Sequence, residues 1–399
     1  MNYTTMGFEI EKPSEGLVFS PNSLYRHLLK LKDKRGKQGR QYELAVIVSL
    51  AIIAKLADQD QVAAIAHWCK LREAEITEWF GLKLKRLPHY GTWLRILGEA
   101  FEVLELQALV KEFLQGAAGK SEVLPARGTI LVALDGKTLR GTIPFGHTQG
   151  VHLVAAYQPN EGLVLAQLAV EEKGNEITIA PKVLEQIELR GRVVVGDAMF
   201  AQKSLSVQIV GAGGDYVWSI KGNQKGILED IEILFEENEQ VPAGCSANPT
   251  DFESYRQVDK GHGRLEERTI NISNMLKDYT PFPHLAQVFK LESRVTRGAK
   301  TSVAVRYGLT SLPREVADAK RLLELIRGEW AIENRLHYRR DNTLREDWSQ
   351  VRLGQAPQVL ATLNNTILSI LDKQGVKNVA RARREFAFNP SLAFNFLIA

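Results

Sequence analysis

Two aspartates follow short apolar runs in a way that suits metal-assisted chemistry. Asp135 comes directly after Thr129–Leu134, and Asp197 comes just after Val193–Val195. In an open α/β sheet, functional groups gather at the carboxyl ends of strands, so the two carboxylates would meet if these strands are neighbours. Two nearby anions repel unless a cation or proton lies between them, and carboxylate oxygens suit Mg²⁺ or Mn²⁺. Either aspartate alone would more often cap a turn, but the pair favours a metal site.

A third acid is needed to complete two metal sites, and Glu333 is the candidate. It lies in the segment RGEWAIENRLHYRRD, within a predicted helix. His337 follows one turn later and Arg340 seven residues later, so the three side chains should share one helix face. The cationic groups would then grip phosphate while the acid holds metal. A single helical glutamate is more often simply solvated than a metal ligand. Glu329 and Glu346 are the competing candidates for the third acid.

Polar and basic side chains also follow the predicted strands at the same sheet edge, where they would contact a phosphate-bearing ligand. They are Lys137, Arg140, Lys221, Asn223 and Gln224. His262 and Arg264, in a later β-rich region, would reach the same ligand. The competing interpretation for each of them is ordinary surface solvation.

The densest positive charge lies near the N-terminus, where only Asp33 opposes it. The basic residues are Arg26, Lys30, Lys32, Lys34, Arg35, Lys37 and Arg40. The net charge of the chain is only +4, so clustering rather than total charge points to nucleic acid. A solvated linker is the alternative. A phosphate-contacting segment agrees better with the acids downstream.

The middle of the chain carries the pattern of a sheet that would position these groups. Apolar, β-branched runs predict buried strands, and apolar residues at helical spacing predict helices. Strands are expected at Thr129–Leu134, Val151–Tyr157, Leu163–Val170, Val193–Val195 and Tyr216–Ile220, and helices at Ile177–Leu189, Ala201–Val210 and Gly226–Glu237. Three strands followed by alternating helices and strands predict a meander joined to parallel crossovers. This order matches an α/β, RNase H-like mixed sheet with flanking helices.

Helical and β-rich regions flank this sheet. Residues from about 20 to 115 should be all-helical, including an apolar helix at Leu44–Leu56, and Gly116–Arg127 is typical of a linker. Residues from about 240 to 313 predict a mainly β insertion, with strands at Arg268–Ile272, Gln287–Arg294 and Ser302–Thr310. The expected domains are therefore a helical DNA-binding domain at 1–120 and a catalytic domain at 121–399 that contains the insertion.

The last catalytic acid is expected on a long helix at Arg314–Arg340. Its apolar stripe comprises Leu322, Leu323, Ile326 and Trp330. A further helix should span about Ala356–Lys373.

The totals describe an ordinary globular protein. The chain has 399 residues, of which 44% are hydrophobic and 25% charged. Its longest apolar run, Leu44–Ala54, is far shorter than the roughly 20 residues that cross a bilayer. Cys69 and Cys245 lie far apart, without metal-ligand spacing, and the N-terminus has no basic-then-apolar leader. These features predict a cytoplasmic protein without disulfides.

Several separated blocks resemble the DDE transposases of bacterial insertion sequences, in particular the H-repeat-associated group. The blocks are ALDGKTLRG around Asp135, EKGNEIT at Glu172–Thr178, GDAMFAQ around Asp197, DYVWSIKGNQ at Asp215–Gln224, DKGHGRLEER at Asp259–Arg268, and WAIENRLHY followed by LREDW at Trp330–Trp348. The resemblance runs in order from about Ser23 to Leu371, which chance does not explain.

The resemblance implies an RNase H-like catalytic domain with a β insertion before its last acid. The family's catalytic and metal-binding acids fall on Asp135, Asp197 and Glu333, and two Mg²⁺ or Mn²⁺ ions per site would serve cleavage and strand transfer. The implied partner is double-stranded DNA, both terminal inverted repeats and target DNA, bound by a homodimer. The side chains after the strands would then position this DNA, and His262 and Arg264 would reach it near the cut. The expected location is the bacterial cytoplasm, at the nucleoid, with no membrane association.

One departure from related cut-and-paste enzymes bears on mechanism. Those enzymes carry a tyrosine, arginine, glutamate and lysine series on the catalytic helix. Here the tyrosine position is Ile326, the arginine position is Glu329 and the final basic position is Arg340. The resemblance therefore leaves open how this chain would handle a flipped base or a hairpin intermediate.

Three other functions compete with a transposase. The first is a catalytically silent or regulatory DNA-binding protein derived from one, which the intact set of three acids disfavours. The second is a stand-alone metal-dependent nuclease that cuts without joining. The third, a phosphotransferase that uses DGKT as a loop, lacks a second aspartate two residues after Asp135.

Overall fold

The computed structural model describes residues 23–81, 87–116, 125–170, 175–240, 251–261 and 263–398. The chain divides into two compact units, one of residues 1–120 with 342–399 and the other of residues 121–341. One boundary between the units lies near residue 120. The C-terminal helices, however, pack with the N-terminal helices rather than with the catalytic sheet. Apolar periodicity shows that a helix has a buried face, but it does not identify the neighbour that covers it.

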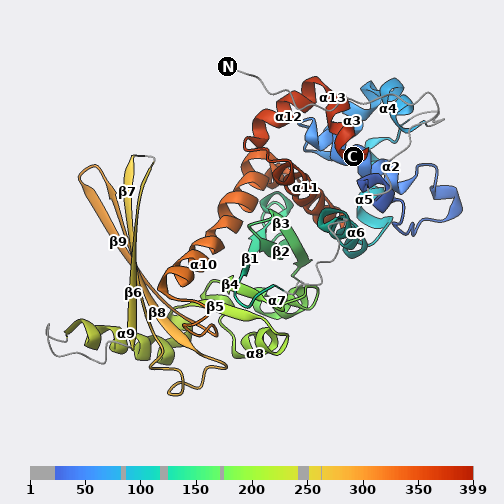
Figure 1. Ribbon diagram of the computed structural model, residues 1–399. Helices are drawn as coiled ribbons and strands as arrows, with labels where there is room; N and C mark the ends of the chain where they lie inside the picture. Colours follow the sequence, from blue (N-terminus) through green and yellow to red (C-terminus); the bar gives the residue numbers. More distant parts are fainter. Residues whose placement is uncertain are drawn as a thin grey trace. The chain divides into compact units, whose positions relative to one another are not determined.

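The helical unit is formed by helices from both ends of the chain (Figure 1). Helix α11 packs against α5 and α6, and α13 packs against α2. The helices of this unit are α1 (Leu24–Leu28), α2 (Leu44–Leu56), α3 (Val62–Leu71), α4 (Glu73–Phe80), α5 (Tyr90–Glu99), α6 (Val103–Gln115), α11 (Ala356–Lys373), α12 (Val379–Phe388) and α13 (Pro390–Ile398).

Helix α2 lies at the centre of the helical unit. Its sequence, LAVIVSLAIIAKL, is apolar on every side, and all of its residues are buried. A helix without a polar face must be covered all round, so the prediction of a buried helix here is confirmed. In the described part of the chain, no helix is both long and apolar enough to cross a membrane.

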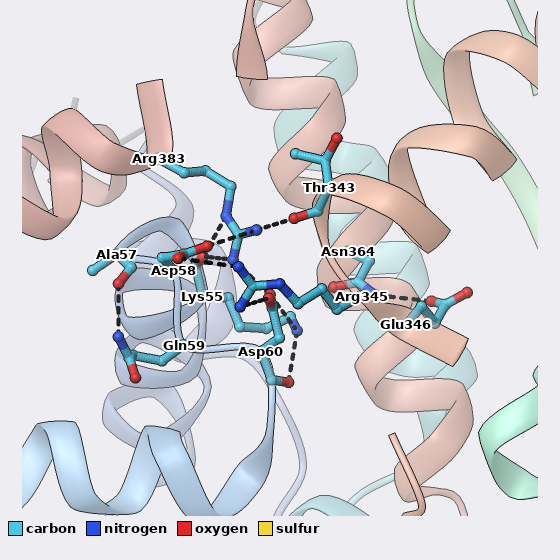
Figure 2. Close-up of polar contacts among 10 residues, drawn as sticks. All are labelled: Lys55, Ala57, Asp58, Gln59, Asp60, Thr343, Arg345, Glu346, Asn364 and Arg383. Carbon is cyan, nitrogen blue, oxygen red and sulfur yellow. Dashed lines mark hydrogen bonds and ion pairs between the residues drawn. The ribbon is translucent and has the colours of Figure 1, made fainter. Parts of the chain in front are cut away.

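A buried network of charged side chains joins α2 to the C-terminal part of the same unit (Figure 2). Lys55 on α2 and Arg383 on α12 are only 2% and 1% exposed. Arg383 donates to Oδ1 of Asp60 at 2.5 Å and to the main-chain oxygen of Lys55 at 2.9 Å. Arg345 lies 3.5 Å from Asp58, which also pairs with Arg383 at 3.2 Å. Each buried charge in this network therefore has an opposite charge beside it.

The second unit, called the catalytic unit below because it carries the three acids predicted to be catalytic, contains one nine-stranded mixed sheet. Its strand order is β3-β2-β1-β4-β5-β9-β8-β7-β6. Strands β1, β4 and β5 are parallel, whereas β2, β3 and β9 run antiparallel to their neighbours. The strands are β1 (Ile130–Thr138), β2 (His152–Gln158), β3 (Leu163–Ala169), β4 (Arg192–Gly196), β5 (Asp215–Ile220), β6 (Phe252–Gly261), β7 (Arg264–Ser273), β8 (Gln287–Arg297) and β9 (Lys300–Thr310). The prediction of an RNase H-like mixed α/β sheet is confirmed.

Helices pack on this sheet and fix its core. Helix α7 (Glu176–Leu184) packs on β2 and β3, and α8 (Lys203–Gly211) packs on β5. Helix α9 (Lys225–Gln240) packs on β8 and β9, whereas α10 (Ala319–Ala331) packs on β1, β4, β6 and β7. Apolar side chains of α10 and of the sheet share one hydrophobic core.

The β insertion is longer than its sequence pattern predicts. It has four strands rather than three, in two long hairpins, and β9 pairs with β5 so that the insertion extends the central sheet (Figure 1). The additional strand, β6, has the sequence FESYRQVDKG and buries neither face fully. Without a buried face it lacks the apolar alternation that marks a strand.

Candidate active site

Asp135 and Asp197 lie on neighbouring strands of the sheet. Strands β1 and β4 are parallel, and Leu134 pairs with Gly196. Asp135 and Asp197 are the next residues along the two strands, so their main chains are adjacent. This register places the two aspartates side by side in the sheet, as expected for neighbouring parallel strands.

The two aspartates also point to the same face. Side chains alternate along a strand, so Asp135 shares a face with Leu131, and Asp197 shares one with Val193 and Val195. These three apolar residues belong to the core formed with α10. Both carboxylates therefore continue the rows of side chains that face the catalytic helix.

The position of Asp135 within its strand differs from the prediction. Asp197 does follow β4, but Asp135 lies inside β1, which continues to Thr138. The continuation pairs with β2, where Asp135 is opposite Ala155. The sequence DGKT after the apolar run is polar enough to suggest a turn, whereas an antiparallel partner keeps it extended.

Helix α10 brings the third acid to this face. Asp318 caps its N-terminus by accepting a hydrogen bond from the main-chain N–H of Arg321 at 2.7 Å. Gly328 lies against Leu131 of β1, and a Cβ at this position would overlap that side chain. The glycine thus permits the close approach of helix and strand that brings Glu329 and Glu333 to the sheet.

The helix becomes π-helical at the site. The π-helical segments are η5 (Ile332–His337) and η6 (Arg339–Thr343), so Glu333 and His337 both lie in wider turns. Such segments are frequent at functional sites. The sequence analysis assumed regular α-helical spacing, which does not hold beyond Ala331. The expected common face of Glu333, His337 and Arg340 is therefore wrong.

Two pairs of side chains join β1 to the π-helical segments. Nδ1 of His337 lies 3.4 Å from Oδ2 of Asp135, and Nζ of Lys137 lies 2.5 Å from Oδ1 of Asp341. Asp135 and Lys137 are two residues apart on the strand, and their partners are four apart on the helix. Asp135 and Lys137, on the same face of β1, thus each contact one residue of the π-helical segments.

A cleft of about 770 Å³ is lined by the three predicted acids and by further charged groups. Its charged lining residues are Asp135, Asp197, Lys221, Glu232, Arg306, Glu329 and Glu333. Glu329 is half-buried, whereas Glu333 is exposed. The cleft is therefore a place where several carboxylates and two cationic side chains come together.

The electrostatics differ between two acids of the cleft. Burial alone would raise the pKa of Asp197, but hydrogen bonds from Lys221 and the Ala198 N–H, with the charges of Lys221 and Arg306, hold that pKa below its usual value. For Glu329, burial and then the negative charges of Asp197 and Asp135 raise the pKa to about 7. Asp197 is thus kept ionised, while Glu329 is placed where a negative charge is unfavourable.

The donor chemistry of the cleft fits a hard divalent cation. Asp135, Asp197, Glu329 and Glu333 offer carboxylate oxygens, which Mg²⁺ and Mn²⁺ prefer. Within the described ranges, no three His, Cys, Asp or Glu side chains are close enough together to hold one ion. The side chain of Asp197 is 52% exposed, so it has room to rotate. These residues fit a metal by type, and closing them around one requires side-chain movement.

Three of the predicted DNA contacts lie in the interior. Arg340 is fully buried and donates to Oε1 of Gln167 at 3.1 Å, while Lys137 and His337 are buried in the contacts with Asp341 and Asp135. A buried side chain that already joins helix to sheet does not reach a phosphate at the surface. In this structure these residues position the catalytic helix, which corrects their assignment to the DNA surface.

Other predicted contacts surround the aspartate of β4. Lys221 pairs with Oδ1 of Asp197 at 2.8 Å. The amides of Asn223 and Gln224 donate to the main-chain oxygens of Ala198 and Ala201 at 2.8 and 2.9 Å. They therefore anchor the 3-10 turn η3 (Ala198–Phe200) that follows Asp197.

The remaining predicted contacts of the catalytic unit are more peripheral. Arg140 is exposed, on the 3-10 turn η2 (Arg140–Thr142) after β1. Arg264 forms an ion pair with Glu266 on β7. His262 lies outside the described residues, so the structure does not describe its predicted position near the cut.

The N-terminal basic cluster is partly engaged in ion pairs within the helical unit. Lys30 pairs with Glu112, Lys34 with Glu102, and Arg35 and Arg40 with Asp33. Arg26, Lys32 and Lys37 are exposed. Four of the seven predicted phosphate contacts thus already have acidic partners, which leaves these three as the exposed charges best able to meet DNA.

Sequence analysis missed one pair of residues in the cleft. Trp330 was expected in the apolar stripe of the helix, but it is 42% exposed, and the guanidinium of Arg306 lies 4.9 Å from its ring centroid. Arg306 is on β9, in the insertion. No local pattern joins residues that distant in sequence, so only the pairing of β9 with β5 reveals that Arg306 lies at the acids.

Family models match most of the chain. The model described as Transposase DDE domain matches residues 126–370, and the one described as DDE_Tnp_1-associated matches residues 25–114. The first match includes Asp135, Asp197 and Glu333. The second covers most of the N-terminal helices α1 to α6.

Individual relatives agree with the family models. The chain is 27% identical over 385 residues to "Putative transposase YncI" of Escherichia coli O157:H7, which covers 93% of each chain. It is 29% identical over 263 residues to "H repeat-associated putative transposase YhhI" of Escherichia coli K12, covering 64% of this chain and 67% of the relative. It is 30% identical over 284 residues to "Uncharacterized protein in dhlA 3'region" of Xanthobacter autotrophicus, covering 70% and 90%.

Proposed function

This chain belongs to the DDE transposases, in the H-repeat-associated group, and we propose that it cuts and joins DNA at insertion-sequence ends with Asp135, Asp197 and Glu333. The observation that supports this most is that the three acids line one cleft, although they come from β1, from the end of β4 and from the catalytic helix. The relatives' names supply the substrate class, and the cleft supplies the chemical groups.

The proposed cofactor is a pair of Mg²⁺ or Mn²⁺ ions held by these carboxylates. Such ions activate water or a 3′-hydroxyl for attack on phosphorus and stabilise the leaving oxygen. The protein's own residues orient the acids: His337 contacts Asp135, and Lys221 contacts Asp197. Arg306, on β9, also lines the cleft and offers a positive charge to a phosphate.

The proposed partner is double-stranded DNA, both inverted repeats and target, held by a homodimer when two ends are joined. The exposed residues Arg26, Lys32 and Lys37 of the helical unit would contact its backbone. A protein with this partner works at the nucleoid in the bacterial cytoplasm. The repeats themselves should flank the gene.

The test is cleavage of an end-labelled duplex that carries the inverted repeat found beside the gene. We expect Mg²⁺ or Mn²⁺ to support nicking at the repeat end, and chelation to abolish it. A pre-cut 3′ end should join to a second duplex, which separates a transposase from a nuclease that only cuts. DNA binding without any cleavage by the wild-type protein would instead indicate a catalytically silent regulator.

A further inference from the structure

Glu329 occupies an unusual place in the cleft. It lies four residues before Glu333, on the last α-helical turn of α10, and lines the same cleft as Asp135 and Asp197. It is more buried than Glu333. In order of depth, Glu329 is therefore an inner acid of this cleft, and Glu333 lies nearer its rim.

The partners of the acids set Glu329 apart. Asp135 contacts His337, and Asp197 is paired with Lys221. Among the described residues, the side chain of Glu329 has no hydrogen-bond or ion-pair partner. A half-buried carboxylate costs free energy unless a cation or a donor compensates for its lost hydration. The protein keeps such a group beside two other acids, where both aspartates repel it.

Neither a phosphate contact nor a structural pair explains this position. The negative charge of a glutamate repels phosphate, so this side chain does not serve to grip DNA. The positive charges of Arg306 and Lys221 attract the Glu329 carboxylate. Among the described residues, however, neither of these side chains forms an ion pair with it. What a glutamate offers at this place is a carboxylate oxygen ligand for a cation.

We propose that Glu329 is a fourth carboxylate of the metal site, acting with Asp135, Asp197 and Glu333. This inference rests on the proposed function, because it assigns a ligand to the same ions. Mg²⁺ in phosphoryl-transfer sites is commonly held by one or two carboxylates together with substrate oxygens, so two ions accommodate four acids. Glu329, on the inner wall, would bind the ion nearest the two aspartates.

The experiment compares Mn²⁺ binding by the full-length protein and its variants in calorimetry without DNA. Glu329→Gln removes the charge and keeps the shape, and Glu333→Gln and Asp135→Asn do the same for two assigned acids. Glu324→Gln is the matched control, since Glu324 is an exposed glutamate on the same helix. We expect Glu329→Gln to weaken Mn²⁺ binding at least about tenfold and Glu324→Gln to leave it unchanged.

Thermal melting in chelator gives a second readout that also checks folding. Removing one of three repelling acids should raise the melting temperature of the metal-free Glu329→Gln protein, and Mn²⁺ should stabilise it less than wild type. Loss of a merely structural carboxylate would lower the melting temperature instead. Should Glu329→Gln fold poorly, Glu329→Asp keeps the charge but shortens the side chain, and it should fold while still binding Mn²⁺ more weakly.

The outcomes separate this inference from the proposed function. If Asp135→Asn and Glu333→Gln weaken Mn²⁺ binding while Glu329→Gln binds like Glu324→Gln, the fourth ligand is refuted and the three-acid site stands. If the wild-type protein binds no Mn²⁺, or all variants bind it equally, the metal site itself is in the wrong place and both proposals fail.

Discussion

The buried charges of the helical unit and the acids of the catalytic cleft are arranged in opposite ways. In the helical unit, Lys55, Asp60 and Arg383 are almost fully buried, and each lies beside an opposite charge. In the cleft, carboxylates of like charge gather, partly exposed, and Glu329 has no ion-pair partner among the described residues. In the first arrangement, each charge is compensated by an opposite charge within the protein. The second has a cost that only a ligand repays, which is the difference between a structural network and a functional site.

The largest expected effect is on catalysis, at the cleft. Asp197→Asn should slow DNA cleavage at least about a thousandfold, equivalent to about 4 kcal/mol of transition-state stabilisation, because a metal ligand is lost. The free energy of unfolding should change little, since Asp197 is half-exposed and its partner Lys221 is exposed. Single-turnover cleavage and urea unfolding of the same protein measure the two quantities. A large loss of stability would place Asp197 with the structural networks instead.

The next effect is on stability, at the buried network. Arg383→Met leaves Asp60 buried without its closest cation, so the free energy of unfolding of the helical unit should fall by about 3–5 kcal/mol. Arg381→Met is the matched control: Arg381 is exposed on the same helix and pairs only with Glu385, so its loss should cost less than about 1 kcal/mol. Equal effects of the two substitutions in urea unfolding would show that the buried network does not stabilise the unit.

The buried network should also make stability depend on pH. Burial, opposed by Asp60, lowers the pKa of Lys55 from 10.5 to about 8. Between these values the unfolded chain binds more protons than the folded one, so the free energy of unfolding should rise with pH, by roughly 3 kcal/mol at most. This contribution is lost as the pH falls through 8. Lys55→Met should abolish the rise, and identical pH profiles for it and the wild type would contradict the assignment.

The smallest effect concerns the N-terminal basic cluster, where paired and exposed cations can be compared directly. Alanine at Arg26, Lys32 and Lys37 should lower the salt slope of DNA binding by up to about 0.9 for each lost phosphate contact. Alanine at Lys30, Lys34 and Arg40, which have acidic partners, should lower it less. Binding isotherms over a range of salt concentrations measure both slopes. If the paired set has the larger effect, the ion pairs open on DNA binding.

Features that depend on residues close together in the sequence could be predicted, whereas features that depend on the local helix type or on distant residues could not. The strands that carry Asp135 and Asp197 were predictable because buried parallel strands are continuous apolar runs. The relative positions of Glu333 and Arg340 on the helix could not be predicted, because residue spacing does not indicate where a helix becomes π-helical. Arg340 proved to be fully buried, held by Gln167 on β3.

Contacts between distant residues were beyond any local pattern. Lys55 and Arg383 are 328 residues apart, and Arg306 reaches the cleft only because β9 pairs with β5. The sequence predicted a helix at Ala356–Lys373 but gave no sign that it packs with the N-terminal helices. Glu329 was visible as a competitor of Glu333, but its depth in the cleft and its lack of a partner appear only in three dimensions.

The most direct test of the central claim is anomalous diffraction from crystals of the protein with Mn²⁺ and a DNA end. We expect manganese peaks in the cleft at coordination distance, about 2 Å, from oxygens of Asp135, Asp197 and Glu333, with Glu329 bound to the inner ion. Peaks confined to other surfaces, or a DNA end seated in the cleft without manganese beside these acids, would contradict it.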